Sequence, residues 1–179
     1  ELKKTGRPII VVNMTGSAVA MEWENRNVDA ILQAWYGGQA AGDAITDILF
    51  GDYNPSGRLP VTVYASADDL PPFESYSMIG RTYRYFRGKP LFPFGFGLSY
   101  TSFAYSQIKC AAKSGTSQSV TVTATVTNTG KKAGDEVAQL YITHPQDGNH
   151  IIPIRSLKGF KRVHLNPGES KTISFELTP

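Results

Sequence analysis

The sequence predicts an α+β chain in two parts, a partial α/β sandwich with a parallel sheet followed by an incomplete antiparallel β-sandwich. Near the start, residues 9–14 (IIVVNM) are continuously apolar and mostly β-branched, which is typical of a parallel strand covered on both faces. From Phe103 onward, short runs alternate apolar with polar residues, as half-buried antiparallel strands do. Between them, residues 81–101 are rich in aromatic residues and glycine. Because so much ring surface needs burial, we interpret this segment as a packed junction.

The composition is that of a globular protein, with 179 residues, of which 41% are hydrophobic and 18% charged. The net charge of +3 comes from scattered lysines and arginines, so we expect no nucleic acid among its partners. No apolar run approaches the roughly 20 residues of a membrane helix, so we expect no membrane partner either. The single cysteine, Cys110, excludes an internal disulfide, and its alternating surroundings predict a small buried side chain in a strand.

The first half of the chain carries three signals for helices. Residues 2–6 place lysines before a glycine, as the last turn of a helix does. Residues 28–36 carry apolar side chains at helical spacing and predict a helix that Asn25–Asn27 would cap. Residues 40–50 predict a further helix that ends at Gly51.

The helical period then disappears until the junction. Residues 52–58 (DYNPSGR) are a cluster of turn formers. Residues 59–64 (LPVTVY) predict a short strand, and Pro60 favours an edge position because proline has no backbone donor. Residues 65–77 have no period and predict an extended surface loop.

The second half predicts about five strands. Four of them are clear alternating runs over residues 119–128, 136–143, 157–164 and 170–177, separated by turn signals. A sandwich of the immunoglobulin type has about seven strands, so we expect this one to be incomplete. The chain has no initiating methionine or signal-like segment, so we expect either a processed protein or a piece of a longer one.

Two long motifs carry a family resemblance. The first runs GGQAAGDAITDILFGDYNPSGRLPVTVY, and the second runs LPPFESYSMIGRTYRYFRGKPLFPFGFGLSYTSF. Together they resemble the C-terminal half of glycoside hydrolase family 3 enzymes, which include β-glucosidases and β-xylosidases. The alternating runs and LKGFKRVHLNPGESKTISFEL resemble the fibronectin type III-like domain that follows in that family. The resemblance implies the end of an α/β/α sandwich over 1–80, the junction over 81–102 and a truncated fibronectin-like domain over 103–179.

The resemblance also implies an activity for a longer protein. Members of the family are exo-acting, retaining β-glycosidases that remove terminal sugars from plant-type oligosaccharides and need no cofactor or metal. An aspartate nucleophile lies in a preceding (β/α)8 barrel, and a glutamate acid/base lies upstream in the sandwich. Neither segment is in this chain, so we assign no catalytic residue and expect the chain alone to be an inactive, architectural part. Its partners would be the glycoside substrate and the missing barrel, in the periplasm or outside the cell.

No pair of carboxylates in the chain predicts a separate active site. Glu22 and Glu24 lie two residues apart before a predicted helix, and we expect solvent to surround them. Asp68 with Asp69, and Asp135 with Glu136, are adjacent in predicted loops or turns and show no reason for a raised pKa. The three histidines lack metal-ligand spacing. We therefore predict only a rim for the sugar site, formed by three residues of the ring-rich loop after Pro72. These candidates for substrate binding are Glu74, Tyr76 and Arg81.

Two other hypotheses stay open at this point. The chain could be a non-catalytic carbohydrate-binding or adhesion module, which would need exposed aromatic rings, whereas the alternating strands show mostly threonine and serine on their polar side. It could also be an interaction piece, since the open edge of an incomplete sandwich is a template for pairing with a companion chain.

Overall fold

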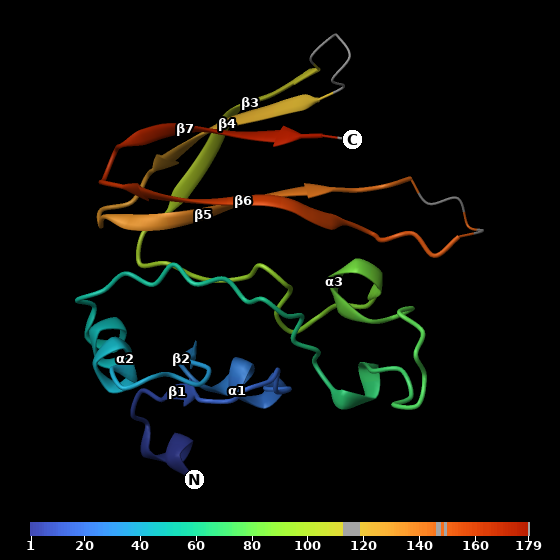
Figure 1. Ribbon diagram of the computed structural model, residues 1–179. Coiled ribbons are helices and arrows are strands. Elements are labelled where there is room, and N and C mark those ends of the chain that lie inside the picture. The colour runs from blue at the N-terminus through green and yellow to red at the C-terminus, as the bar shows by residue number, and fades with distance from the viewer. Residues whose placement is uncertain (113–118, 146–147, 149, 179) are drawn as a thin grey trace.

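In the computed structural model, which describes residues 1–112, 119–145, 148 and 150–178, the chain has the two expected parts (Figure 1). A set of short helices and a small parallel sheet lies at the N-terminal end, and two packed antiparallel sheets lie at the C-terminal end. The segment after α3 runs between the two parts, where the sequence places the junction. The α+β class and the order of the parts are therefore confirmed.

The first part contains seven short elements. They are η1 (Leu2–Thr5), β1 (Ile10–Asn13), α1 (Glu22–Asn27), β2 (Ala30–Gln33), α2 (Ala41–Phe50), η2 (Ala67–Asp69) and α3 (Thr82–Tyr85). Two predicted helix ends are confirmed, because Gly6 (φ 70°) ends η1 and Gly51 (φ 86°) ends α2. Both glycines adopt the left-handed conformation that L side chains disfavour, and both donate their N–H groups back to the preceding turn.

The helix predicted over residues 28–36 is wrong. The helix lies earlier, as α1, and the N–H group of Val28 closes its last turn on the carbonyl of Glu24. Asn25–Asn27 therefore lie inside this helix rather than before one. The following residues form β2, which pairs in parallel with β1 from Ala30 to Gln33. A short apolar run has no decisive period, and here the hydrogen bonds to β1 determine its conformation.

The edge strand predicted over residues 59–64 is also wrong, apart from one β-bridge between Val63 and Phe92. Leu59 instead hydrogen-bonds irregularly to the junction, donating to the Phe96 carbonyl and accepting from the Gly95 N–H. Pro60 cannot donate to a ladder, so the segment follows the junction without becoming a regular strand.

Most rings of the junction are half-buried, and four of them pack in pairs. Tyr83 stacks on Phe94 with 4.2 Å between ring centroids, and Phe92 stacks on Phe96 at 5.4 Å. Gly97 lets two backbones meet, because a Cβ atom there would lie 2.1 Å from the Gly57 carbonyl oxygen. The junction is therefore a packed layer, as predicted from its composition.

In the residues that the structure describes, the second part is a sandwich of five strands. The strands are β3 (Phe103–Ala112), β4 (Val120–Asn128), β5 (Gly134–Ile142), β6 (Ser156–Leu165) and β7 (Ser170–Leu177). One sheet has the order β3-β4-β7 and the other pairs β5 with β6, all antiparallel. The core between the sheets consists of Val126, Ala138, Val163, Leu165 and Ile173.

Cys110 is exposed, which corrects the prediction of a buried side chain. It lies in β3, the edge strand of the three-stranded sheet, and almost every residue of this strand faces solvent. Ile108 in the same strand is 69% exposed. Alternation in the sequence shows that a strand has two faces, but it does not show whether a second layer covers either of them.

Candidate functional site

The loop after η2 carries the three residues predicted to border a sugar site, and two of them are exposed. Glu74 is exposed, and Tyr76 and its neighbour Phe73 are almost fully exposed, at 101% and 97%. Large rings are seldom left so open on a protein surface. The loop therefore presents a carboxylate and two rings outward from the first part of the chain.

Arg81, the third candidate, points into the loop rather than out of it. Its guanidinium group donates to the carbonyl oxygens of Pro72 (3.0 Å), Ser75 (2.9 Å) and Ser77 (3.0 Å). A guanidinium is always charged and offers several donors in a fixed plane, so it suits three carbonyls that converge on one point. The structure thus brings the three candidates into one loop but gives Arg81 the role of holding it.

The base of the loop is fixed by the residue that follows Arg81. Thr82 has a positive φ of 56°, and its N–H group donates to the hydroxyl of Tyr64 at 2.8 Å. The ring of Tyr64 packs edge-on against Phe86, with 4.8 Å between centroids. The exposed rings of the loop therefore stand on a packed support.

Most of the other carboxylates that were considered as catalytic pairs have structural partners. Asp69 closes a capping box with Ser66 at the start of η2, and Asp68 also bonds to Ser66. Glu22 pairs with Arg26 on the surface of α1. These three carboxylates therefore take part in the local hydrogen bonds and ion pair of η2 and α1.

One buried ion pair joins the two parts of the chain. Arg58 donates to a carboxylate oxygen of Glu136 at 2.6 Å, and their side chains are only 14% and 12% exposed. The hydroxyl of Tyr105 donates to the other oxygen at 2.8 Å. Burial, together with this hydrogen bond, raises the pKa of the Tyr105 hydroxyl well above its ordinary value.

Sequence reasoning missed this pair, although a signal was present. Glu136 lies on the buried face of β5, the same face as Gly134 and Ala138. An acidic residue at such a position requires a buried partner. The arginine of the NPSGRLP motif was available for that role.

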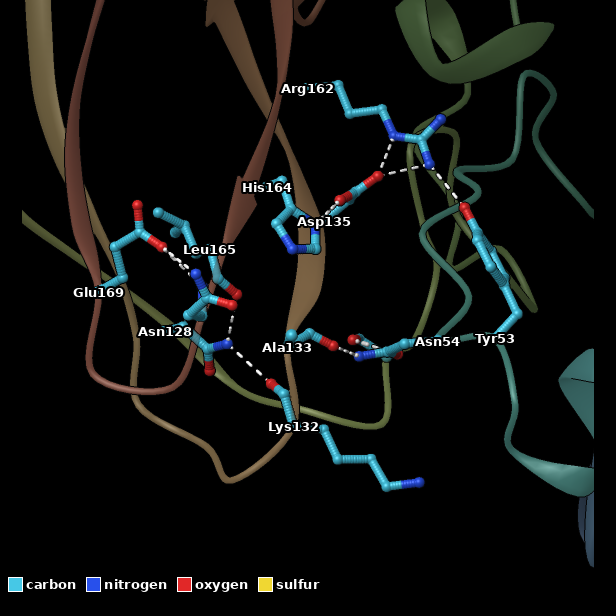
Figure 2. A network of polar contacts seen from close by, with 12 residues as sticks. Tyr53, Asn54, Asn128, Lys132, Ala133, Asp135, Arg162, His164, Leu165 and Glu169 are labelled. Atoms are coloured by element: carbon cyan, nitrogen blue, oxygen red, sulfur yellow. Dashed lines mark hydrogen bonds and ion pairs between the residues drawn. The ribbon is translucent and has the colours of Figure 1, made fainter.

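A second polar network joins the turn after α2 to the sandwich (Figure 2). Asp135 accepts hydrogen bonds from Arg162 (2.6 Å) and from the ring of His164 (2.6 Å), and Arg162 also donates to the Tyr53 hydroxyl (2.7 Å). Burial alone would raise the pKa of Asp135, but the hydrogen bonds from His164 and Arg162 outweigh it and hold the pKa below its ordinary value. The network therefore stabilises the ionised carboxylate.

Replacing Asp135 by asparagine is expected to make the free energy of unfolding less dependent on pH in the acidic range. A carboxylate with a lowered pKa in the folded state contributes stability above its unfolded pKa of about 4 and loses it as the pH falls further. Because Arg162 and His164 are more than half exposed, we expect D135N to cost only about 1 kcal/mol at pH 7. Urea unfolding should show the two proteins converging below about pH 4. D52N, an exposed control in the same region, should show no such convergence, and an equal D135N deficit at pH 7 and pH 3 would contradict the assignment.

Among the residues that the structure describes, no group of three or more histidine, cysteine, aspartate or glutamate side chains could hold a metal ion. In the same residues, no helix has the length and apolar content needed to cross a membrane. The site that remains is the exposed loop on its packed support.

Comparison with known proteins identifies the family. Residues 1–100 match the glycosyl hydrolase family 3 C-terminal domain, and residues 136–179 match the fibronectin type III-like domain. This chain belongs to glycoside hydrolase family 3. It is 49% identical, over 99% of its length, to a xylan 1,4-beta-xylosidase of Xylanibacter ruminicola, of which it covers 20%. It is 41% identical, over 98% of its length, to a periplasmic beta-glucosidase of Salmonella typhimurium, of which it covers 25%.

Solved structures of the family have the same fold. The chain superimposes on beta-glucosidase 3B from Thermotoga neapolitana, solved in complex with glucose, with a TM-score of 0.87 and 36% identity. The match covers 98% of this chain and 26% of that one. The chain thus spans about a fifth to a quarter of the length of these relatives. The domain boundaries near residues 80 and 102 stay predictions.

Proposed function

We propose that this chain is an architectural part of a retaining, exo-acting β-glycosidase that removes terminal glucose or xylose from plant-type oligosaccharides. The similarity of almost the whole chain to about a quarter or less of a β-xylosidase and of β-glucosidases carries the proposal. Retaining hydrolysis needs two carboxyl groups about 5–5.5 Å apart. Local hydrogen bonds or ion pairs hold the carboxylates of Glu22, Asp68, Asp69, Asp135 and Glu136. Both catalytic groups would therefore lie elsewhere in a longer protein.

Hydrolysis of aryl β-glucoside and aryl β-xyloside by the 179-residue chain and by the longer protein tests this function. We expect turnover by the longer protein and none by the chain alone. The substrate with the higher kcat/KM would identify the sugar. Turnover by the chain alone would show that it contains its own catalytic pair, and Glu74 would then be the first residue to replace.

We further propose that the loop over residues 71–81 borders the sugar site of the longer protein. Glu74 and Tyr76 would contact the substrate, because they project from a loop that the guanidinium of Arg81 holds in one shape. The periplasmic relative supports a periplasmic or secreted location for this protein too.

Substitutions in this loop of the longer protein are expected to weaken substrate binding. A lost ring contact or hydrogen bond of about 1 kcal/mol corresponds to a KM about fivefold higher for Y76A and E74Q. R81M should have a similar effect through loss of the loop's shape, and R81K should recover part of it. Y36A, which removes an exposed tyrosine elsewhere (78% exposed), is the matched control. A KM that none of the loop variants changes would exclude the loop from the site.

The exposed rings also support a second function, a carbohydrate-binding module. Phe73 and Tyr76 offer the open aromatic surface that such a module needs. Calorimetric titration of the 179-residue chain with xylo- and cello-oligosaccharides distinguishes the two functions, because an architectural part should bind neither.

A further inference from the structure

The residues just before β6 reach from the sandwich to the ring-rich loop. The N–H group of Ile154 donates to the carbonyl of Arg84 in α3 at 2.6 Å. At the start of β6, the N–H group of Leu157 donates to the hydroxyl of Tyr83 at 3.1 Å. Because α3 directly follows the loop over residues 71–81, these bonds place this part of the sandwich beside the loop (Figure 1).

A pocket of about 160 Å³ lies where the two segments meet. Its walls are mainly four isoleucines and a tyrosine, namely Ile79 of the loop, Tyr85 of α3, and Ile151, Ile152 and Ile154 of the sandwich. Arg87 and His150 complete the lining. Ile79 and Ile151 are 58% and 62% exposed, so the pocket leaves apolar surface open to solvent, as ligand sites do.

The volume and the lining of the pocket suit one aromatic ring. A cavity of about 150 Å³ lined by leucine, isoleucine and phenylalanine binds benzene, and the volume here is nearly the same. Isoleucine side chains offer no hydrogen bonds, so hydroxyl groups of a sugar ring would lose water there without gaining a partner. The pocket therefore favours an apolar ring over a sugar.

We propose that this pocket binds the aromatic leaving group of an aryl β-glycoside. The proposal rests on the proposed function, in which the loop over residues 71–81 borders the sugar site. Tyr76 and Ile79 belong to this one loop, and the guanidinium of Arg81 fixes its shape, so the sugar contact and the pocket keep a constant separation. A substrate that carries both a sugar and a linked ring fills both places. The sandwich thereby takes part in substrate selection, because it supplies three of the four isoleucines.

Calorimetric titration of the longer protein with a series of 1-thio-β-glucosides tests the pocket. The methyl, phenyl, benzyl and 2-phenylethyl members resist hydrolysis and differ only in the group attached to sulfur, so the series varies the reach of the ring. The corresponding xylosides replace them if xylose is the preferred sugar. We expect the best aromatic member to bind about tenfold or more tightly than the methyl member, because its ring leaves water for an apolar site. Dissociation constants that agree within about threefold across the series would overturn the proposal, because another part of the longer protein would then cover the pocket.

Substitutions in the pocket test where the aromatic ring binds. I151A, in the sandwich, and I79A, in the loop, should each reduce the tenfold preference for the aromatic member to about threefold or less, and I151L should retain most of it. I108A is the matched control, because it removes an isoleucine of similar exposure (69%) from β3. An aromatic preference that I151A and I79A leave intact, or that I108A lowers equally, would place the ring elsewhere and refute the pocket.

The outcomes separate this inference from the function on which it rests. Hydrolysis by the longer protein without any preference for the aromatic members would reject this inference alone. A preference that I151A and I79A abolish, in a longer protein that hydrolyses neither aryl glycoside, would reject the proposed function alone.

Discussion

Replacing Arg58 by alanine is expected to lower the free energy of unfolding by about 3–5 kcal/mol at pH 7. The substitution leaves the Glu136 carboxylate buried, with only the Tyr105 hydroxyl to satisfy it. Removing one partner of a buried ion pair costs far more than the pair contributes, because the remaining charge is neither solvated nor neutralised. Arg58 also donates to the carbonyl of Gly57 at 3.1 Å, so the turn before the junction loses a support as well.

The double variant R58M/E136L is the decisive control in urea unfolding followed by circular dichroism. Replacing both charges by apolar residues of similar size removes the desolvation penalty, so most of the lost stability should return. R58K should keep the charge and lose less than R58A. A deficit below about 1 kcal/mol for R58A would mean that water reaches Glu136 in solution. If R58A does not fold, the double variant still distinguishes the two causes. Recovery of folding would show that the unpaired Glu136 charge, and not a general loss of packing, destabilises R58A.

The strands of the second part could be predicted because their sequence carries the signal directly. Strict alternation over residues 119–128 and 170–177 corresponds to β4 and β7, which pair with each other residue by residue from Val120↔Leu177 to Thr127↔Ser170. Each antiparallel strand repeats its own period of two and needs no information from distant residues. The turn at residues 166–168 then connects β6 of one sheet to β7 of the other.

The parallel sheet of the first part was harder to predict, because its evidence is not local. Residues 28–36 satisfy a helical spacing as well as a short apolar strand. The conformation of residues 30–33 is determined by pairing with β1, in which Val11 lies opposite Ile31 and Val12 opposite Leu32.

The role of Arg81 was also hard to predict from local sequence. The sequence indicated that Arg81 belonged to a functional loop, but only the converging carbonyls of Pro72, Ser75 and Ser77 show that it holds the loop.

Replacing Asn128 by alanine is expected to cost about 3 kcal/mol or more in the free energy of unfolding. Asn128 is fully buried, and its amide nitrogen donates to the carbonyls of Lys132 (2.8 Å) and Leu165 (3.0 Å). Its amide oxygen accepts from the Thr101 hydroxyl (2.7 Å) and the Gly130 N–H (3.0 Å). One side chain therefore joins the junction, the loop after β4 and the end of β6. Figure 2 shows its bonds to Lys132 and Leu165. Alanine would leave several of these groups without a partner and without water.

Aspartate at the same position separates loss of hydrogen bonds from loss of volume. N128D keeps the shape, but its ionised oxygens would face the carbonyl oxygens of Lys132 and Leu165, which the amide nitrogen now satisfies. We therefore expect N128D to be at least as destabilising as N128A at pH 7 and to recover partly in acid, where a protonated carboxyl can donate again. T123A, in the same strand, should cost less than about 1 kcal/mol. If N128D were as stable as the original chain at pH 7, the direction of these hydrogen bonds would be wrong, and Asn128 could not be the donor that joins the junction to the sandwich.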